Sequence, residues 1–446
     1  MVHQKVSGPL SALAIWLTVL VVLVIYSRLS ERIAAAFGFN PFLVLILAGS
    51  CFLLMIMTGG LARGLLAKPG ILLTLFTLWL MFATVFSVWR GGSVSLLRDY
   101  WSKSYVLYLI LAGLLVSLEH CRKVLYALAG AALIIEAAVL LDRGAGQQRL
   151  VLGLGSFTNP NDLAFYLAFS LPGCVLLILN SRSFSIRRAV GLVSAGLIAI
   201  LVFRTGSRGG LLMILAAFLF LFLTSSLTAK IKLMAAVGLI GGIAIVTTGS
   251  DVIERYKTIL RDPQPVSDET SEVAKAQGST SARKKLLEAA ILITLKNPIV
   301  GVGPGMFQVA AADDPYTARI LFAAWKETHN SFTQVSSESG IPGFLLYMAI
   351  IFSVFAALVR VWRRSRKRKD LKPYFHVAYC LMLMLVIYLV GASFGSSAYN
   401  FFLPTLAGLA VALDRCTQQD KLLAPVQPRS SQLSRPAARL ANIRGA

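Results

Sequence analysis

Long apolar runs recur along this chain, and a single long polar segment interrupts them. Of the 446 residues, 57% are hydrophobic and only 14% are charged, whereas soluble domains carry about 25% charged residues. The runs reach about 17–20 residues, the length that a helix needs to cross a bilayer. They lack the alternating pattern of outer-membrane barrels. Because helices satisfy their own backbone hydrogen bonds in lipid, the sequence predicts an all-α polytopic membrane protein.

The apolar runs predict about twelve transmembrane helices, with boundaries accurate to a few residues. The expected spans are 10–27, 41–58, 70–88, 104–118, 124–141, 162–179, 189–203, 209–225, 232–249, 341–359, 375–394 and 399–414. The first run resembles a signal peptide, but it is long and lacks a small-residue cleavage site, so we interpret it as a span. The predicted domains are nine helices in 1–249, a polar insert with amphipathic helices in 250–340, three helices in 341–414 and a basic disordered tail in 415–446.

The net charge of +23 is compatible with nucleic-acid binding or with the excess of Lys and Arg in cytoplasmic loops. The basic residues concentrate in the loops on the side of the two termini, most densely from Arg360 to Lys372. We therefore expect no nucleic-acid partner. Both termini should face the cytoplasm, the basic run should contact anionic membrane lipids, and the insert should face outward. The five cysteines avoid the insert and lack metal-ligand spacing, so we expect neither disulfides nor a metal site.

Two arginines lie in the short turn Phe203-Arg-Thr-Gly-Ser-Arg-Gly-Gly between two expected spans. Its glycines permit a tight turn and close backbone approach. A guanidinium group matches phosphate oxygens in bidentate fashion, so Arg204 and Arg208 are candidates for phosphate contact. The alternative is that both side chains snorkel to water. Their position on the outer side, where arginine is disfavoured, favours the functional interpretation.

The insert contains a second basic motif, Ser279-Thr-Ser-Ala-Arg-Lys-Lys, that starts a predicted helix. Ser279 or Ser281 would cap this helix, and Asn297-Pro298 would end it. An apolar stripe predicts that it lies on the membrane surface or against the bundle; the stripe comprises Leu286, Leu287, Ala290, Ile291 and Thr294. Arg283, in the first turn, gains nothing from the helix dipole. Either a phosphate contact or a solvated basic face would explain it.

Further along the insert, Gly301-Val-Gly-Pro-Gly lacks the Lys-Ser/Thr of a phosphate loop. We interpret it as a turn that re-enters the membrane. His329 follows, and it is the only histidine expected on the outer side. If its segment is helical, His329, Thr333 and Ser336 share one face. The imidazole suits proton transfer near neutral pH, with Glu327 close in sequence, although a purely structural role is the alternative.

The order and spacing of these motifs resemble the O-antigen ligase / polysaccharide polymerase superfamily of bacterial envelope glycan assembly. The resemblance extends from Asn159-Pro-Asn-Asp through Thr205-Gly-Ser-Arg208, Arg283 and Asn297-Pro-Ile-Val-Gly to His329-Asn-Ser-Phe and Gly340-Ile-Pro-Gly. It implies a GT-C-like fold with a periplasmic insert. It also implies a metal-independent glycosyltransferase, without a cofactor, in the bacterial inner membrane. Such an enzyme moves a glycan from a polyprenyl (undecaprenyl) diphosphate carrier to an acceptor hydroxyl.

The resemblance also implies roles for particular residues. Arg208 and Arg283 correspond by position to the diphosphate-contacting arginines, and His329 to the essential histidine. Weaker candidates for binding diphosphate or glycan are Arg204, Arg255, Lys284 and Asn330. The superfamily includes ligases that use lipid A–core as acceptor, polymerases and protein-glycosylating ligases, which the motifs do not separate. We favour an O-antigen ligase, with a polymerase as the alternative.

Two other classes of protein compete with this interpretation. A secondary transporter also has twelve spans, but transport sites need ionisable groups near the midplane, and only Glu136 lies well inside an expected span. A flux assay with labelled solute would identify a transporter. A non-enzymatic scaffold for an envelope complex would tolerate loss of the outward arginines and histidine, which a transferase would not.

Overall fold

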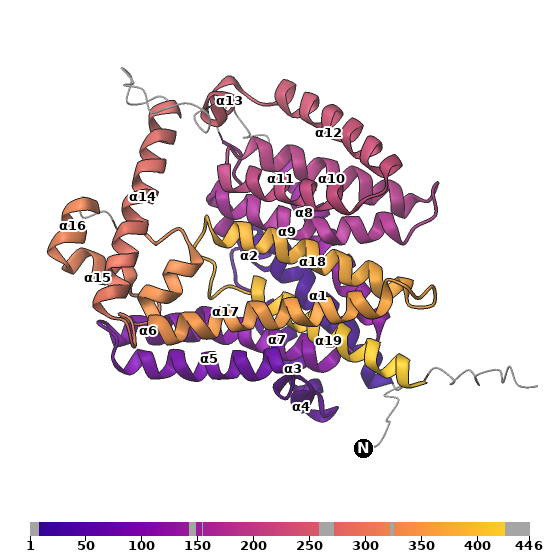
Figure 1. Cartoon of the computed structure of the whole chain (residues 1–446), viewed down its shortest axis with the longest axis horizontal. Helices are drawn as coiled ribbons and strands as arrows, with labels where there is room; N and C mark the ends of the chain where they lie inside the picture. The colour runs from indigo at the N-terminus through magenta and orange to yellow at the C-terminus, as the bar shows by residue number, and fades with distance from the viewer. Residues whose placement is uncertain (1–8, 142–148, 154, 258–271, 322–324, 424–446) are drawn as a thin grey trace, which may run out of the picture.

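The computed structural model describes residues 9–141, 149–153, 155–257, 272–321 and 325–423, and every regular element in these ranges is a helix (Figure 1). The elements are α1 (Pro9–Ser27), α2 (Leu29–Phe37), α3 (Leu43–Met57), α4 (Gly60–Leu65), α5 (Lys68–Val85), α6 (Arg90–Leu96), η1 (Leu97–Trp101), α7 (Ser102–Leu114), α8 (Leu118–Leu141), η2 (Gly155–Thr158), α9 (Pro160–Leu179), α10 (Ile186–Arg204), α11 (Arg208–Thr224), α12 (Leu227–Thr247), α13 (Ser250–Lys257), α14 (Glu272–Lys296), α15 (Phe307–Asp313), α16 (Pro315–Leu321), α17 (Ser331–Ser365), α18 (Lys372–Ala392) and α19 (Phe402–Leu423).

A helix lies at each of the twelve expected positions, and the chain is an all-α polytopic membrane protein. Eight helices are long and apolar enough to cross a membrane, namely α1, α5, α8, α9, α10, α12, α17 and α18. α3 and α11 are shorter apolar helices. α7 is shorter than predicted, but α6, the π-helical η1 and α7 form one uninterrupted helical stretch from Arg90 to Leu114.

The predicted start of the disordered tail at residue 415 is wrong, because α19 continues to Leu423. The guanidinium of Arg415 explains part of this extension. It donates hydrogen bonds to the carbonyls of Ala112 and Leu115, at 2.8 and 2.7 Å, and so ties α19 to the end of α7. Residues 424–446 lie outside the described residues.

The spanning helices run lengthwise through the bundle, and the insert gathers at one end of it (Figure 1). Helices α14, α15 and α16 lie at the left end in this view, while the basic turn between α17 and α18 lies at the right end. The predicted topology requires this separation of the insert from the most basic turn. All five cysteines are buried and free.

The insert has a small core of its own, made by α14, α15, α16 and the segment between α14 and α15. Its buried members are Leu286, Ala289, Ala290, Ile293, Val302, Met306, Phe307, Ala311 and Leu321. α14 starts at Glu272, before the predicted caps, and ends at Lys296, directly before Asn297-Pro298 as predicted. Of the predicted apolar stripe, Leu286 and Ala290 belong to this core. Leu287 and Ile291 are 42% and 48% exposed, because α14 turns the neighbouring face toward α15 and α17.

α17 consists of two helical segments that meet at Gly340, where φ is 72° and ψ is −178°. A side chain at Gly340 would place its Cβ 2.1 Å from the carbonyl oxygen of Ile299. Glycine therefore meets two needs here, since it adopts a positive φ and leaves room for the neighbouring backbone. The shorter segment, before Gly340, belongs to the insert end of the molecule, and the longer one runs through the bundle.

Candidate functional site

The turn between α10 and α11 is tight, as the sequence predicts. Gly206 has a φ of 61°, and Ser207 caps α11 by accepting a hydrogen bond from the backbone N–H of Gly210 at 3.1 Å. Arg208 is the first residue of α11. A Cβ at Gly206 would lie 3.3 Å from Nε of Arg149. The glycine therefore lets arginine side chains approach the turn closely.

Two arginines from other segments hold the carbonyl groups of this turn. Arg255 on α13 donates from Nε to the carbonyl of Gly206 at 3.0 Å, and Arg149 donates from Nε to the carbonyl of Thr205 at 2.9 Å. Arg255 is buried. Arg149 is not among the residues predicted from the sequence. Its segment has no motif, and only the fold brings it beside the 204–208 turn.

Arg208 reaches across to the insert. Its guanidinium donates to the hydroxyl of Thr280 on α14 at 2.5 Å, and Arg283 lies one turn further along the same helix. The charge of Arg208 interacts unfavourably with those of Arg255 and Arg283. Burial and the charge of Arg255 lower the pKa of Arg283. We call Arg208, Arg255 and Arg283 the arginine cluster. It joins α11, α13 and α14, and three neighbouring guanidinium groups suit an anionic ligand.

The other basic candidates lie outside this cluster. Arg204 is half-buried at the last position of α10, and its carbonyl accepts a hydrogen bond from the backbone N–H of Leu150 at 3.0 Å. Lys284 is exposed on α14. Their contribution to ligand binding stays a prediction.

His329 does not lie on a helix, contrary to the arrangement considered from the sequence. Its φ is 51°, and α17 begins two residues later, at Ser331. The backbone N–H of His329 donates to the hydroxyl of Ser396 at 3.0 Å. Burial, followed by the charges of Arg283 and Lys326, lowers the pKa of His329. The imidazole therefore adjoins the arginine cluster and stays neutral at pH 7.

Asn330, another candidate, caps α17. Its Oδ1 accepts hydrogen bonds from the backbone N–H groups of Phe332 and Thr333, at 2.9 and 3.2 Å. Its Nδ2 donates to the carbonyl of Ser393 at 3.3 Å. Both ends of the amide thus fix the start of α17 and the position of His329 beside it. A direct contact with substrate stays a prediction.

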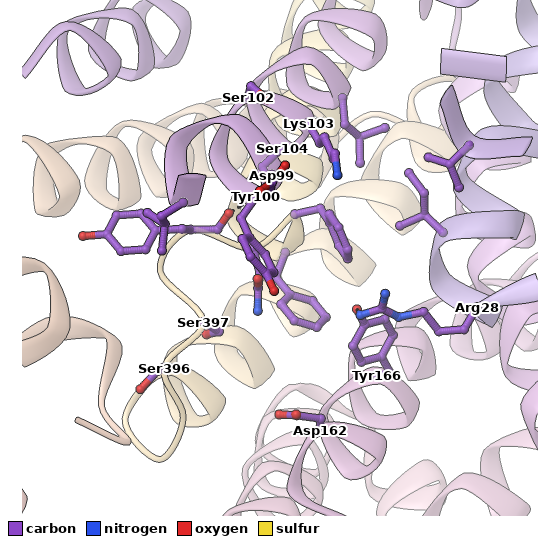
Figure 2. Close-up of a pocket in the computed structure, with 18 of the residues that line it drawn as sticks. Arg28, Asp99, Tyr100, Ser102, Lys103, Ser104, Asp162, Tyr166, Ser396 and Ser397 are labelled. Atoms are coloured by element: carbon purple, nitrogen blue, oxygen red, sulfur yellow. Dashed lines mark hydrogen bonds between the residues drawn. The ribbon is translucent and has the colours of Figure 1, made fainter. Parts of the chain in front are cut away.

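A cavity of about 1220 Å³ opens on the other side of His329. It lies among α1, α3, α7, α9, α17 and the loop between α18 and α19, and Figure 2 shows polar and aromatic side chains along its wall. Its polar lining includes Arg28, Asp99, Lys103, Asp162, Tyr166, Glu327, His329, Glu338, Ser396 and Ser397. None of the three members of the arginine cluster lines it. His329 therefore lies between the arginine cluster and the cavity.

The glycine-rich segment Gly301–Gly305 braces this site, and its re-entry into the membrane stays a prediction. Its backbone N–H groups at Val302 and Gly303 donate to the carbonyls of Ser337 and Glu338, at 3.0 and 2.9 Å. Gly305 donates to the carboxylate of Glu338 at 2.8 Å. The segment links α14 to α15 and fastens both to the first segment of α17.

In the part of the chain that the structure describes, no group of three or more His, Cys, Asp or Glu side chains is arranged to hold a metal ion. In a comparison with known families, the model of the O-antigen ligase family matches residues 192–348. This range contains the 204–208 turn, the arginine cluster and His329. A search of curated proteins finds no match. The match confirms the resemblance drawn from the motifs.

Proposed function

We propose that this chain, whose residues 192–348 belong to the O-antigen ligase family, moves a glycan from a polyprenyl diphosphate carrier to an acceptor hydroxyl. The observation that carries the proposal is the position of His329 between three converging guanidinium groups and a cavity of about 1220 Å³. The arginine cluster would bind the diphosphate, and the cavity would receive the acceptor. The family match supports a membrane glycan transferase. The geometry supports separate binding of the diphosphate at the arginine cluster and of the acceptor in the cavity.

The proposed step depends on stabilising the negative charge that develops on the leaving diphosphate. As the bond between the anomeric carbon and the diphosphate oxygen breaks, negative charge grows on the diphosphate. Guanidinium groups already held in place stabilise that charge in the transition state. The proposal needs no metal ion or other cofactor. His329, beside both reactants, would deprotonate or orient the attacking hydroxyl.

The carrier lipid would enter sideways at the level of its headgroup, so the arginine cluster must lie at a membrane boundary. We propose that this boundary is the periplasmic face of the inner membrane and that both termini are cytoplasmic. The placement of the insert and of the basic α17–α18 turn at opposite ends of the bundle supports this orientation. Cysteine-accessibility labelling of residues in α14 and in the basic turn would test it.

The direct test replaces Arg208, Arg283 and His329 by alanine, one at a time. Each variant should reach the membrane at normal levels and lose glycan transfer. Full activity in all three variants would refute the proposal.

Analysis of the product distinguishes the two main alternatives within the family. A ligase, which we favour, joins one glycan to a lipid A–core acceptor, whereas a polymerase produces a ladder of longer glycans on the carrier. Deletion of the chain should remove long-chain lipopolysaccharide and leave the carrier-linked polymer intact.

A further inference from the structure

A carboxylate lies two residues before His329 and lines the same cavity. Glu327 is exposed and is one of the residues that line the cavity. Ser396 joins the two residues, because its hydroxyl accepts from the backbone N–H of His329 at 3.0 Å and also contacts the carboxylate of Glu327. Figure 2 shows Ser396 on the loop between α18 and α19 at the wall of the cavity. The Ser396 hydroxyl therefore fixes the positions of Glu327 and His329 relative to each other.

The charges around these two side chains are opposite in sign. His329 faces the cations Arg283 and Lys326, so a proton on the imidazole would add a third positive charge. Glu327 faces the carboxyl groups of Asp162 on α9 and Glu338 on α17. A proton on Glu327 would remove a negative charge from among three acidic groups. Electrostatics thus favours proton uptake by Glu327 over proton uptake by His329.

The pKa directions agree with this comparison. Burial, followed by the two neighbouring cations, lowers the pKa of His329. Although Glu327 is exposed, the protein around its carboxyl group displaces water and raises its pKa, and the contact with Ser396 opposes this rise. A general base works best when its pKa lies near the operating pH. The environment moves the carboxyl group toward that range and the imidazole away from it.

We propose that Glu327 is the general base for the acceptor hydroxyl and that neutral His329 orients this hydroxyl by a hydrogen bond. This inference rests on the proposed function. The hydroxyl proton moves to the carboxylate of Glu327, and the acceptor oxygen forms a bond to the anomeric carbon. The bond from that carbon to the diphosphate oxygen breaks, and its electron pair leaves with the diphosphate. The proton on Glu327 then passes to water through the cavity.

The other acidic groups of the cavity fit this role less well. The carboxylate of Glu338 is buried and accepts the N–H of Gly305 at 2.8 Å, so it braces the glycine-rich segment. Asp162 lies in the first turn of α9, on a different element from His329, and its carboxyl group interacts with the cation Arg28. Only Glu327 belongs to the same segment as His329.

The test uses the full-length protein in nanodiscs, with undecaprenyl-diphosphate-linked oligosaccharide as donor and lipid A–core as acceptor. Glu327→Gln should lower kcat by about 100-fold or more, the contribution expected of a general base. It should leave the affinity for undecaprenyl diphosphate unchanged, because the arginine cluster is intact. Glu327→Asp should retain more activity than Glu327→Gln, and formate should partly restore Glu327→Ala. Glu119→Gln, a control in the first turn of α8 and outside the cavity lining, should behave as the wild type.

The pH profile provides a second readout. Activity should fall on acidification as Glu327 becomes protonated. Ser396→Ala removes a contact that lowers the pKa of Glu327, so the acidic limb of kcat/KM should move to higher pH. A purely structural role for Glu327 would predict no rescue by formate and no such shift.

The outcomes separate the two proposals. The general-base role of Glu327 would be overturned by a normal kcat in Glu327→Gln together with an unchanged acidic limb of the kcat/KM profile in Ser396→Ala. If Arg208→Ala and Arg283→Ala still abolish transfer in that case, the proposed glycan transfer is retained and only the role of Glu327 is rejected. If both arginine variants are fully active, the proposed function fails as well. If Glu327→Gln does not fold, the activity of Glu327→Asp and the rescue of Glu327→Ala by formate test the role of Glu327 instead. Loss of activity in Glu327→Asp without rescue by formate would overturn that role.

Discussion

Arg255 and Gly206 fasten the insert to the transmembrane bundle, because Nε of Arg255 donates to the Gly206 carbonyl over 3.0 Å. The bond leaves the rest of the guanidinium among the charges of Arg208 and Arg283. One buried side chain thus fixes the turn that carries Arg208 and contributes charge of its own. The arginine cluster depends on this connection between α13 and the α10–α11 turn.

Arg255→Lys tests whether donor binding needs only the positive charge of Arg255 or also its planar guanidinium group. Lysine keeps the positive charge but has a single ammonium group, so it cannot bind the Gly206 carbonyl and present a planar fork at the same time. We expect the KM for the carrier-linked donor to rise about tenfold in Arg255→Lys, and kcat/KM to fall about 100-fold in Arg255→Ala. The exposed Arg319 on α16 offers a matched control, and Arg319→Lys should leave both constants unchanged. Normal donor kinetics in Arg255→Ala would remove this residue from the cluster.

Gly206→Ala tests the turn itself. A β-carbon at a φ of 61° is strained by about 1–2 kcal/mol, and it would also lie 3.3 Å from Nε of Arg149. We expect a lower midpoint of thermal unfolding and weaker donor binding. Gly38→Ala is the control, since Gly38 has a φ of 73° with nothing within 4 Å of the added carbon. It should lower the unfolding midpoint and leave donor binding intact, whereas equal effects of the two variants on donor binding would contradict a role for the turn.

The titration of His329 should depend on Arg283. The charge of Arg283 lowers the pKa of His329, so Arg283→Gln should raise that pKa and Arg283→Lys should leave it low. Because only the neutral imidazole reacts with diethyl pyrocarbonate, the loss of labelling on acidification should begin at a higher pH in Arg283→Gln. Mass spectrometry of the labelled peptide measures this in inactive variants too. Identical labelling curves for the wild type and Arg283→Gln would show that the two side chains are not neighbours.

The sequence predicts much of this structure, and what it misses has physical causes. Apolar length locates a helix at every expected span, and the glycines locate the 204–208 turn. Arg149 and Ser396 could not be found in this way, since neither belongs to a motif and only tertiary packing brings them to the site. Which residues of the α14 stripe pack inside the protein could not be predicted, because Leu287 and Ile291 are as apolar as the residues that are buried. The position of His329 depends on its positive φ, which its residue type does not indicate.

Glu338 provides a final prediction, which concerns the brace behind the site. Its buried carboxylate accepts the N–H of Gly305, and its own carbonyl accepts the N–H of Gly303. Glu338→Ala keeps the carbonyl bond but removes the side-chain bond to Gly305 and the carboxyl contacts with Tyr399 and the backbone N–H of Phe307, and each buried donor left without an acceptor costs about 1–3 kcal/mol in the free energy of unfolding. Glu338→Gln retains an acceptor oxygen of nearly the same shape, so it should unfold close to the wild type.

Unfolding midpoints in detergent, measured for both Glu338 variants, check the size of the effect, and glycan transfer measured on the same samples shows what the brace does for the site. Since the brace positions the first segment of α17, and Asn330 at its start adjoins His329, Glu338→Ala should also lose activity. Glu338→Gln should keep it. A Glu338→Gln variant that is stable but inactive would instead show that the negative charge itself takes part in the reaction, and the acidic wall of the cavity would then share the role that we assign to Glu327.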